Sequence, residues 1–200
     1  MSDLEATLRR ISGCLRSSHA RFALVGGLAV SARTEPRFTR DTDLCVAVRD
    51  DAEAEALIRD LRGRGYEVIA LVEQEAVGRL ATARLSDIRT AEAPGEVDLL
   101  FASSGIEREI IAQAEPIEVF VGTHVPVATV PALLASKVLA RDDRRRPQDR
   151  ADALALLAVA TAEEVAAART LLRLVEDRGY ARGRDLLEAL DALVAEFGTG

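Results

Sequence analysis

The pattern of hydrophobic and polar residues predicts an amphipathic helix at the start of the chain. Large apolar side chains recur at three- and four-residue spacing within residues 2–20, so they fall on one face of an α-helix. These side chains are Leu4, Leu8, Ile11 and Leu15.

Short apolar runs with Gly or Pro between several of them predict a set of strands in the next hundred residues. We expect strands at 21–25, 43–48, 66–72, 79–85, 96–101, 117–121 and 125–128. Helical spacing predicts helices at 28–33, 51–64 and 104–114.

From Pro131 onward the pattern is helical throughout. We expect helices at 131–141, 147–159, 162–178 and 183–197. Thr161 and Glu164 have the spacing of a capping box for the third of these. The chain is therefore predicted to be α/β (α+β): a mixed β-sheet lobe with flanking helices over residues 1–130, and a helical lobe packed on it over residues 131–200.

Composition narrows the classes of function. The chain has 200 residues, of which 48% are hydrophobic, so it can build a substantial core. Aromatic residues make up 4% and Trp is absent, which argues against large stacking platforms for single-stranded nucleic acid. The net charge of −7 argues against broad binding to a phosphate backbone. Local arginine clusters at 33–40 and 141–146 leave room for a basic patch, although a solvated surface explains them as well.

Cysteine and histidine offer little for chemistry. Cys14 and Cys45 are two isolated cysteines, so we expect small core residues and neither a zinc site nor a disulfide. His19 and His124 stand alone, which argues against histidine-based catalysis. No stretch approaches the ~18 apolar residues that a membrane span needs, and no secretion signal is visible, so we expect a cytoplasmic protein without a membrane partner.

A pair of glycines marks the first candidate for a binding site. Gly26 and Gly27 follow a predicted buried strand and come directly before a predicted helix. Such a turn lets a backbone approach a phosphate closely and points helix N–H groups at the anion. A plain tight turn would have the same sequence, so the pair needs support from other residues.

Three aspartates supply that support. Asp41 and Asp43 are two residues apart at the start of a strand, so their side chains leave the same face. Asp98 alternates in the same way in a second strand. If the two strands are neighbours, the carboxylates converge and need a cation, and hard oxygen ligands suit one or two Mg²⁺ ions. The alternative is that these aspartates form salt bridges with Arg37 and Arg40.

The chain contains a single lysine. Of its 26 basic residues, all but Lys137 are arginine. Lysine provides a compact point charge that arginine cannot always replace beside a phosphate. Arg141 lies four residues further along the same predicted helix, so both cations are expected on one helix face.

The order of these motifs resembles the DNA polymerase β-like nucleotidyltransferase superfamily, and the later segments resemble its AbiEii-type toxin branch. The segments that carry the resemblance are Gly26-Gly27, residues 37–44 (RFTRDTDL), 97–100 (VDLL), 125–140 (VPVATVPALLASKVLA) and 146–154 (RPQDRADAL). One departure is that the superfamily often has Gly-Ser where this chain has Gly26-Gly27.

The resemblance implies a role for each matching residue. Gly26 and Gly27 would hold the triphosphate, Asp41 and Asp43 the metal, and Asp98 the third acidic position. In the helical half, Lys137 would contact the phosphates and Asp149 would complete the site, with Asp152 close by. For Asp149 and Asp152, a favourable interaction with the helix N-terminal dipole is the alternative explanation.

These observations predict a Mg²⁺-dependent enzyme that transfers a nucleoside monophosphate from an NTP to a hydroxyl acceptor. Asp98 is the best-placed candidate to accept the proton of that hydroxyl. The acceptor could be RNA such as tRNA, a protein or a small molecule, and the resemblance also implies a possible cognate antitoxin. One alternative is a non-catalytic nucleotide- or protein-binding module with the same fold. A metal-dependent phosphohydrolase is less consistent with two scattered histidines.

Overall fold

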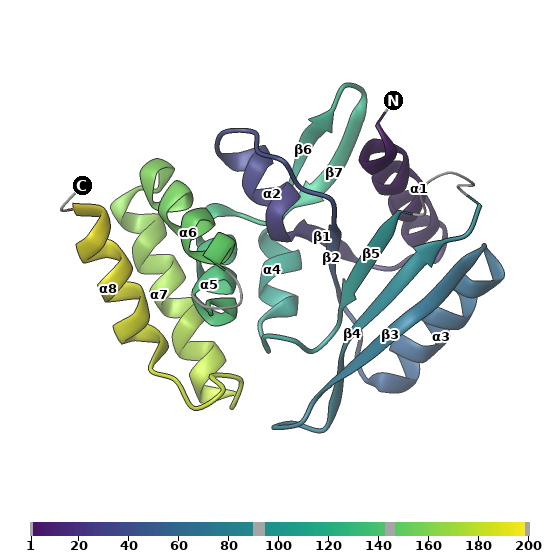
Figure 1. Ribbon diagram of the computed structural model, residues 1–200. Helices are drawn as coiled ribbons and strands as arrows, with labels where there is room; N and C mark the ends of the chain where they lie inside the picture. The colour runs from purple at the N-terminus through teal and green to yellow at the C-terminus, as the bar shows by residue number, and fades with distance from the viewer. Residues whose placement is uncertain (1, 90–94, 143–146, 199–200) are drawn as a thin grey trace.

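The centre of the molecule is a mixed seven-stranded sheet, which confirms the predicted α/β class. The computed structural model describes residues 2–89, 95–142 and 147–198. The strand order is β3-β4-β5-β2-β1-β7-β6 (Figure 1). The strands are β1 (Phe22–Val25), β2 (Thr42–Val46), β3 (Tyr66–Gln74), β4 (Arg79–Asp87), β5 (Glu96–Leu100), β6 (Glu115–Phe120) and β7 (Thr123–Val127).

The register at the middle of the sheet brings the predicted acidic strands together. β2 runs antiparallel to β1 and parallel to β5, and Asp43 is the direct partner of Asp98. β4 runs antiparallel to β5 and pairs Arg84 with Asp98. Side chains directly opposite each other on neighbouring strands leave the same face of the sheet, so these three charged groups are neighbours.

The helices fall into two sets. One set accompanies the sheet, and the other forms a group beside it. Four of them accompany the sheet: α1 (Asp3–Ser17), α2 (Gly26–Arg33), α3 (Asp51–Gly63) and α4 (Glu107–Gln113). The others are α5 (Val130–Ala140), α6 (Pro147–Val159), α7 (Ala162–Asp177) and α8 (Leu186–Gly198). Figure 1 shows α5–α8 together on one side of the molecule, with the β3–β4 hairpin and α3 on the other. The division into two lobes near residue 130 stays a prediction.

Two predicted helices begin later than expected, and each has a local cause. The helix expected from residue 104 begins at Glu107, because the carboxylate of Glu107 accepts hydrogen bonds from the amides of Ser103 and Ser104 and holds them in a turn. The helix expected from residue 183 begins at Leu186. Gly183 has a φ of +71°, which a right-handed helix does not allow.

One continuous cluster of buried apolar side chains joins the sheet to the helices. On α1, Leu8, Ile11 and Leu15 of the predicted stripe are fully inaccessible, and Leu4 is partly buried. Helix α5 is buried on most of its surface, because it packs against α2 and against α6, α7 and α8. The capping box of α7 is present as predicted, with Thr161 and Glu164 bonding reciprocally. Across the described ranges, no helix has the length and apolar character of a membrane span.

Candidate active site

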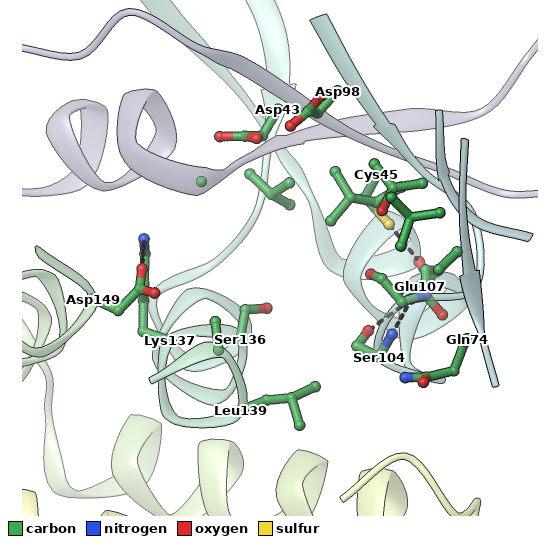
Figure 2. Close-up of a pocket in the computed structure, with 18 of the residues that line it drawn as sticks. Asp43, Cys45, Gln74, Asp98, Ser104, Glu107, Ser136, Lys137, Leu139 and Asp149 are labelled. Atoms are coloured by element: carbon green, nitrogen blue, oxygen red, sulfur yellow. Dashed lines mark hydrogen bonds and ion pairs between the residues drawn. The ribbon is translucent and has the colours of Figure 1, made fainter. Parts of the chain in front are cut away.

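Asp43 and Asp98 meet on one face of the sheet, at the wall of a cavity of about 960 Å³. The opposite wall is formed by α5, which carries Lys137, and the start of α6, which carries Asp149. Figure 2 shows Asp43 and Asp98 from the strands facing Lys137 and Asp149 from the helices across this space. The predicted convergence of Asp43, Asp98, Lys137 and Asp149 is therefore present in the fold.

The electrostatic environment of Asp43 is unfavourable for its charge. Burial raises the pKa of this carboxyl, and the neighbouring carboxylates of Asp98 and Asp41 raise it further, to about 7. Lys137 and Arg84 oppose the shift without cancelling it. A carboxylate in this position therefore gains free energy from any cation that binds beside it.

Arg84 is a component of the site that the sequence motifs do not reveal. Its Nε and Nη2 donate to the two oxygens of Asp98 at 2.8 and 2.6 Å, so the pair is bidentate. Asp98 holds the pKa of the Arg84 guanidinium above its ordinary range. From the sequence, strand alternation alone could have predicted which face of its strand Arg84 occupies. The pairing of β4 with β5 was needed to place it opposite Asp98.

The two glycines make room for charged side chains. Gly26 has a φ of +67°, and a Cβ built on it would lie 1.8 Å from Oδ2 of Asp43. A Cβ on Gly27 would lie 2.6 Å from Nη2 of Arg37. Gly26 also lines the cavity, whereas Gly27 does not. The predicted contact of these glycines with a triphosphate stays a prediction; in this structure Gly27 packs against Arg37.

Lys137 is held by two carboxylates of α6. Its Nζ lies 2.7 Å from Oδ1 of Asp149 and 2.8 Å from Oδ2 of Asp152. Its side chain is 11% exposed. Asp152 in turn binds Arg37 through two hydrogen bonds of 2.7 Å each. Burial would raise the pKa of Asp152, but the bonds from Arg37 and Lys137 outweigh it and hold that pKa below its ordinary value.

The remaining predicted residues lie at the edges of the site. Asp41 is exposed and precedes β2, where it lines a second hollow of about 870 Å³ together with Phe38 and Arg40. Arg141 lines the main cavity, but α5 ends at Ala140, so Arg141 does not continue the helix as its spacing from Lys137 suggested. Residues 143–146 of the predicted basic run lie outside the described residues.

The donor set fits a magnesium ion that shares its coordination with a substrate. Among the described residues, no group of three His, Cys, Asp or Glu side chains could hold a metal ion by itself. Mg²⁺ is typically bound by one or two carboxylates, with water and substrate phosphates completing its octahedron. Asp43 and Asp98 provide such a pair of hard oxygen ligands, and the raised pKa of Asp43 indicates that Lys137 and Arg84 do not fully offset its burial and the neighbouring carboxylates.

The fold is shared with known nucleotidyltransferase structures. One is an antigenic nucleotidyltransferase-like protein from Paracoccidioides brasiliensis, with a TM-score of 0.55 and 20% identity over 95% of this chain and 93% of that one. Another is the lincosamide antibiotic adenylyltransferase LnuA bound to lincomycin, with a TM-score of 0.51 and 15% identity over 78% of this chain and 98% of that one. At these sequence identities, the similarity to the two structures shows that this chain shares their fold. No curated protein matches the sequence.

The sequence also matches a family model. Residues 12–197 match the family described as nucleotidyl transferase AbiEii toxin, type IV toxin–antitoxin system. The chain belongs to this family and is a nucleotidyltransferase. The resemblance drawn from the sequence motifs is thereby confirmed.

Proposed function

We propose that this protein transfers a nucleoside monophosphate from an NTP to a hydroxyl acceptor, with Mg²⁺ bound by Asp43 and Asp98 and with Asp41 at the rim. The observation that supports this most directly is the pair of carboxylates on β2 and β5 that faces Lys137 across a 960 Å³ cavity. In such a reaction the acceptor oxygen forms a bond to the α-phosphorus, the α–β phosphoanhydride bond breaks, and pyrophosphate leaves. The acceptor loses its proton.

The residues of the chain contribute charge and position. Lys137 is a compact cation on the helical wall and is expected to contact the phosphates from the side opposite Asp43. Gly26 begins α2, so the first N–H groups of that helix are available to an anion beside Asp43. Preorganised donors of this kind stabilise the charge that develops in the transition state. The metal, when bound, would neutralise the phosphate charge and orient the attacking oxygen.

The role of Asp98 as a proton acceptor stays part of the proposal. Each of its oxygens already accepts one hydrogen bond from Arg84. A carboxylate oxygen has a second lone pair, so both a metal contact and a proton transfer remain available to Asp98.

The acceptor and the biological role are further parts of the proposal. RNA such as tRNA, a protein and a small molecule are the three acceptor classes to be compared. Membership in a toxin family supports a role as the toxin of a toxin–antitoxin pair, and with it a cognate antitoxin.

The test is incubation of the protein with each α-³²P-labelled NTP and Mg²⁺, in separate reactions with total RNA, cell protein and candidate antibiotics. We expect label to pass to one acceptor class, with release of unlabelled pyrophosphate. EDTA should abolish the transfer, and Asp43→Ala should lower it by at least about 1,000-fold. Lys137→Gln should lower it by about 100-fold or more, because it removes charge from the phosphate side.

Asp191→Asn provides the control for these variants. Asp191 forms an exposed ion pair with Arg169 on the outside of the helical group, so the variant loses a charge without touching the cavity. Its activity should equal that of the wild type. Full transfer activity in Asp43→Ala, or labelling that persists in EDTA, would contradict the proposed mechanism.

A further inference from the structure

The carboxylate of Asp152 is saturated by hydrogen bonds. Oδ1 accepts from Nε of Arg37 at 2.7 Å and from Nε2 of Gln148 at 3.1 Å. Oδ2 accepts from Nη2 of Arg37 at 2.7 Å and from Nζ of Lys137 at 2.8 Å. An ionised carboxylate has about four lone-pair positions. Asp152, which is 1% exposed, therefore has no position left for a substrate or a metal.

Asp149 differs from Asp152 in this respect. It occupies the same helix one turn earlier and also binds Lys137, through Oδ1 at 2.7 Å. Its Oδ2 is buried and has no hydrogen-bond partner among the described residues. Asp149 also lines the cavity, whereas Asp152 does not. Of the two aspartates, Asp149 is the one that can accept a hydrogen bond from a ligand.

The bonds of Asp152 connect the helical wall of the cavity to the segment that precedes β2. Lys137 lies on α5, and Arg37 lies in the segment between α2 and β2. The guanidinium of Arg37 rests against Gly27 and donates to the carbonyl of its own neighbour, Phe38, at 3.0 Å. This segment leads directly into β2, which carries Asp43. One buried carboxylate thus fixes both the lysine and the path of the chain into the metal-binding strand.

The bonds to α6 also set the direction of Lys137. A lysine ammonium has three N–H donors, and two of them are directed at Asp149 and Asp152. The third is available to a ligand. Figure 2 shows the nitrogen of Lys137 at the end of the side chain that rises from α5 toward the strand of Asp43.

We propose that Asp152 is a positioning residue: it aims the ammonium of Lys137 into the cavity and, through Arg37, ties the segment before β2 to helix α6. The expected effect of this role on activity rests on the nucleotidyl transfer proposed above. The orientation of Lys137 is independent of that proposal and can be measured in the protein without nucleotide.

The single lysine allows a direct experiment. Protein labelled with [ζ-¹⁵N]lysine has one side-chain ammonium signal, from Lys137. In the wild type, we expect this signal to be visible near pH 7, because two ion-pair bonds and burial slow the exchange of its protons with water. In Asp152→Asn, the signal should shift and exchange at least about 10-fold faster. In Arg37→Gln it should persist, because Lys137 keeps both of its carboxylate partners.

Asp87→Asn is the matched control. Asp87 is fully buried and forms an ion pair with Arg10, but it lines neither hollow. Both Asp87→Asn and Asp152→Asn should lower the melting temperature, but Asp87→Asn should leave the lysine signal unchanged. An unchanged lysine signal in Asp152→Asn would overturn the proposal. An equal change in Asp87→Asn would also overturn it, because the effect would then reflect general loosening of the fold.

Kinetics provide a second readout of the same proposal. With α-labelled NTP and the acceptor identified as above, Asp152→Asn and Arg37→Gln should each lower kcat/KM by about 100-fold, the scale expected for misplaced catalytic groups. Asp87→Asn should stay within about threefold of the wild type. If the wild type transfers no nucleotide, the proposed function fails while the lysine signal still decides the role of Asp152. If kcat/KM is unchanged in both site variants, the positioning role is overturned.

Discussion

Gly26 has a left-handed backbone conformation, and the carboxylate of Asp43 lies directly against its Cα. Its φ of +67° disfavours any residue with a Cβ, and the space that a Cβ would occupy holds the carboxylate of Asp43. The residue therefore determines where the carboxylate of Asp43, the proposed metal ligand, can lie. This is a more specific requirement than the close approach of a phosphate.

We predict that Gly26→Ala loses both stability and activity. The left-handed conformation alone costs about 1–2 kcal/mol, and Asp43 must also move away from the new methyl group. Thermal unfolding and the α-³²P transfer assay measure the two effects. Gly13→Ala is the control, because Gly13 is exposed on α1 and a Cβ added to it would meet nothing within 4 Å. It should raise the free energy of unfolding by about 0.5–1 kcal/mol and leave activity unchanged.

Helix α5 depends at its C-terminus on a residue from a distant loop. The last carbonyl groups of a helix have no partner within the helix. Arg184, which precedes α8, donates to the carbonyls of Leu139 and Arg141 through Nη1 and of Val138 through Nη2, at 3.0–3.2 Å. The guanidinium thus completes the end of the helix that carries Lys137.

We predict that Arg184→Met destabilises the protein by about 1–3 kcal/mol, because it leaves helix-end carbonyls without a donor. It should also weaken the binding of Mg²⁺–NTP, since the end of α5 near Lys137 is no longer fixed. Chemical denaturation and a nucleotide titration followed by thermal shift measure the two effects.

Thr161→Ala is the control for Arg184→Met, because it removes a helix cap that lies away from the site. Thr161 caps α7 with a capping box and lines no part of the cavity. The variant should cost about 1 kcal/mol of stability and leave nucleotide binding unchanged. Nucleotide binding that is unchanged in Arg184→Met as well would show that the α5 terminus does not contribute to the site.

The cluster around Asp43 contributes to the pH dependence of the free energy of unfolding. In the folded protein the pKa of Asp43 is raised to about 7 by burial and by Asp98 and Asp41. Between about pH 4 and pH 7 the folded state therefore binds more protons at this residue than the unfolded state does. Stability contributed by this residue falls as pH rises through that window, and the loss is complete above pH 7.

We predict that Asp43→Asn is more stable than the wild type at pH 8 in EDTA, by at most about 4 kcal/mol, and equal to it near pH 4. Urea denaturation at several pH values measures the difference, and the contributions of groups distant from Asp43 cancel between the two proteins. Mg²⁺ at pH 8 should stabilise the wild type and have a smaller effect on the variant. A difference in stability that does not change with pH would contradict the raised pKa.

The sequence by itself determined the elements and predicted most of the residues of the candidate site. Apolar periodicity located the helices and strands, because each element must bury one face. Residue chemistry singled out Asp43, Asp98 and Lys137 as candidates, and the resemblance to the nucleotidyltransferase family added Asp149. Turn geometry was harder to read: the late start of α4 at Glu107 depends on a side chain that binds the preceding amides.

The tertiary structure decided which of these groups meet and which residues hold them in place. Arg84 joins the site only because β4 pairs with β5, and strand pairing is not encoded in local spacing. Asp41 lies exposed before β2 and lines the second hollow, while its charge still raises the pKa of Asp43, so its predicted role as a metal ligand stays a prediction. Arg37 and Asp152 are 115 residues apart in the chain. Their contact depends on the packing of α6 beside α2, so only the folded molecule determines where the single lysine points.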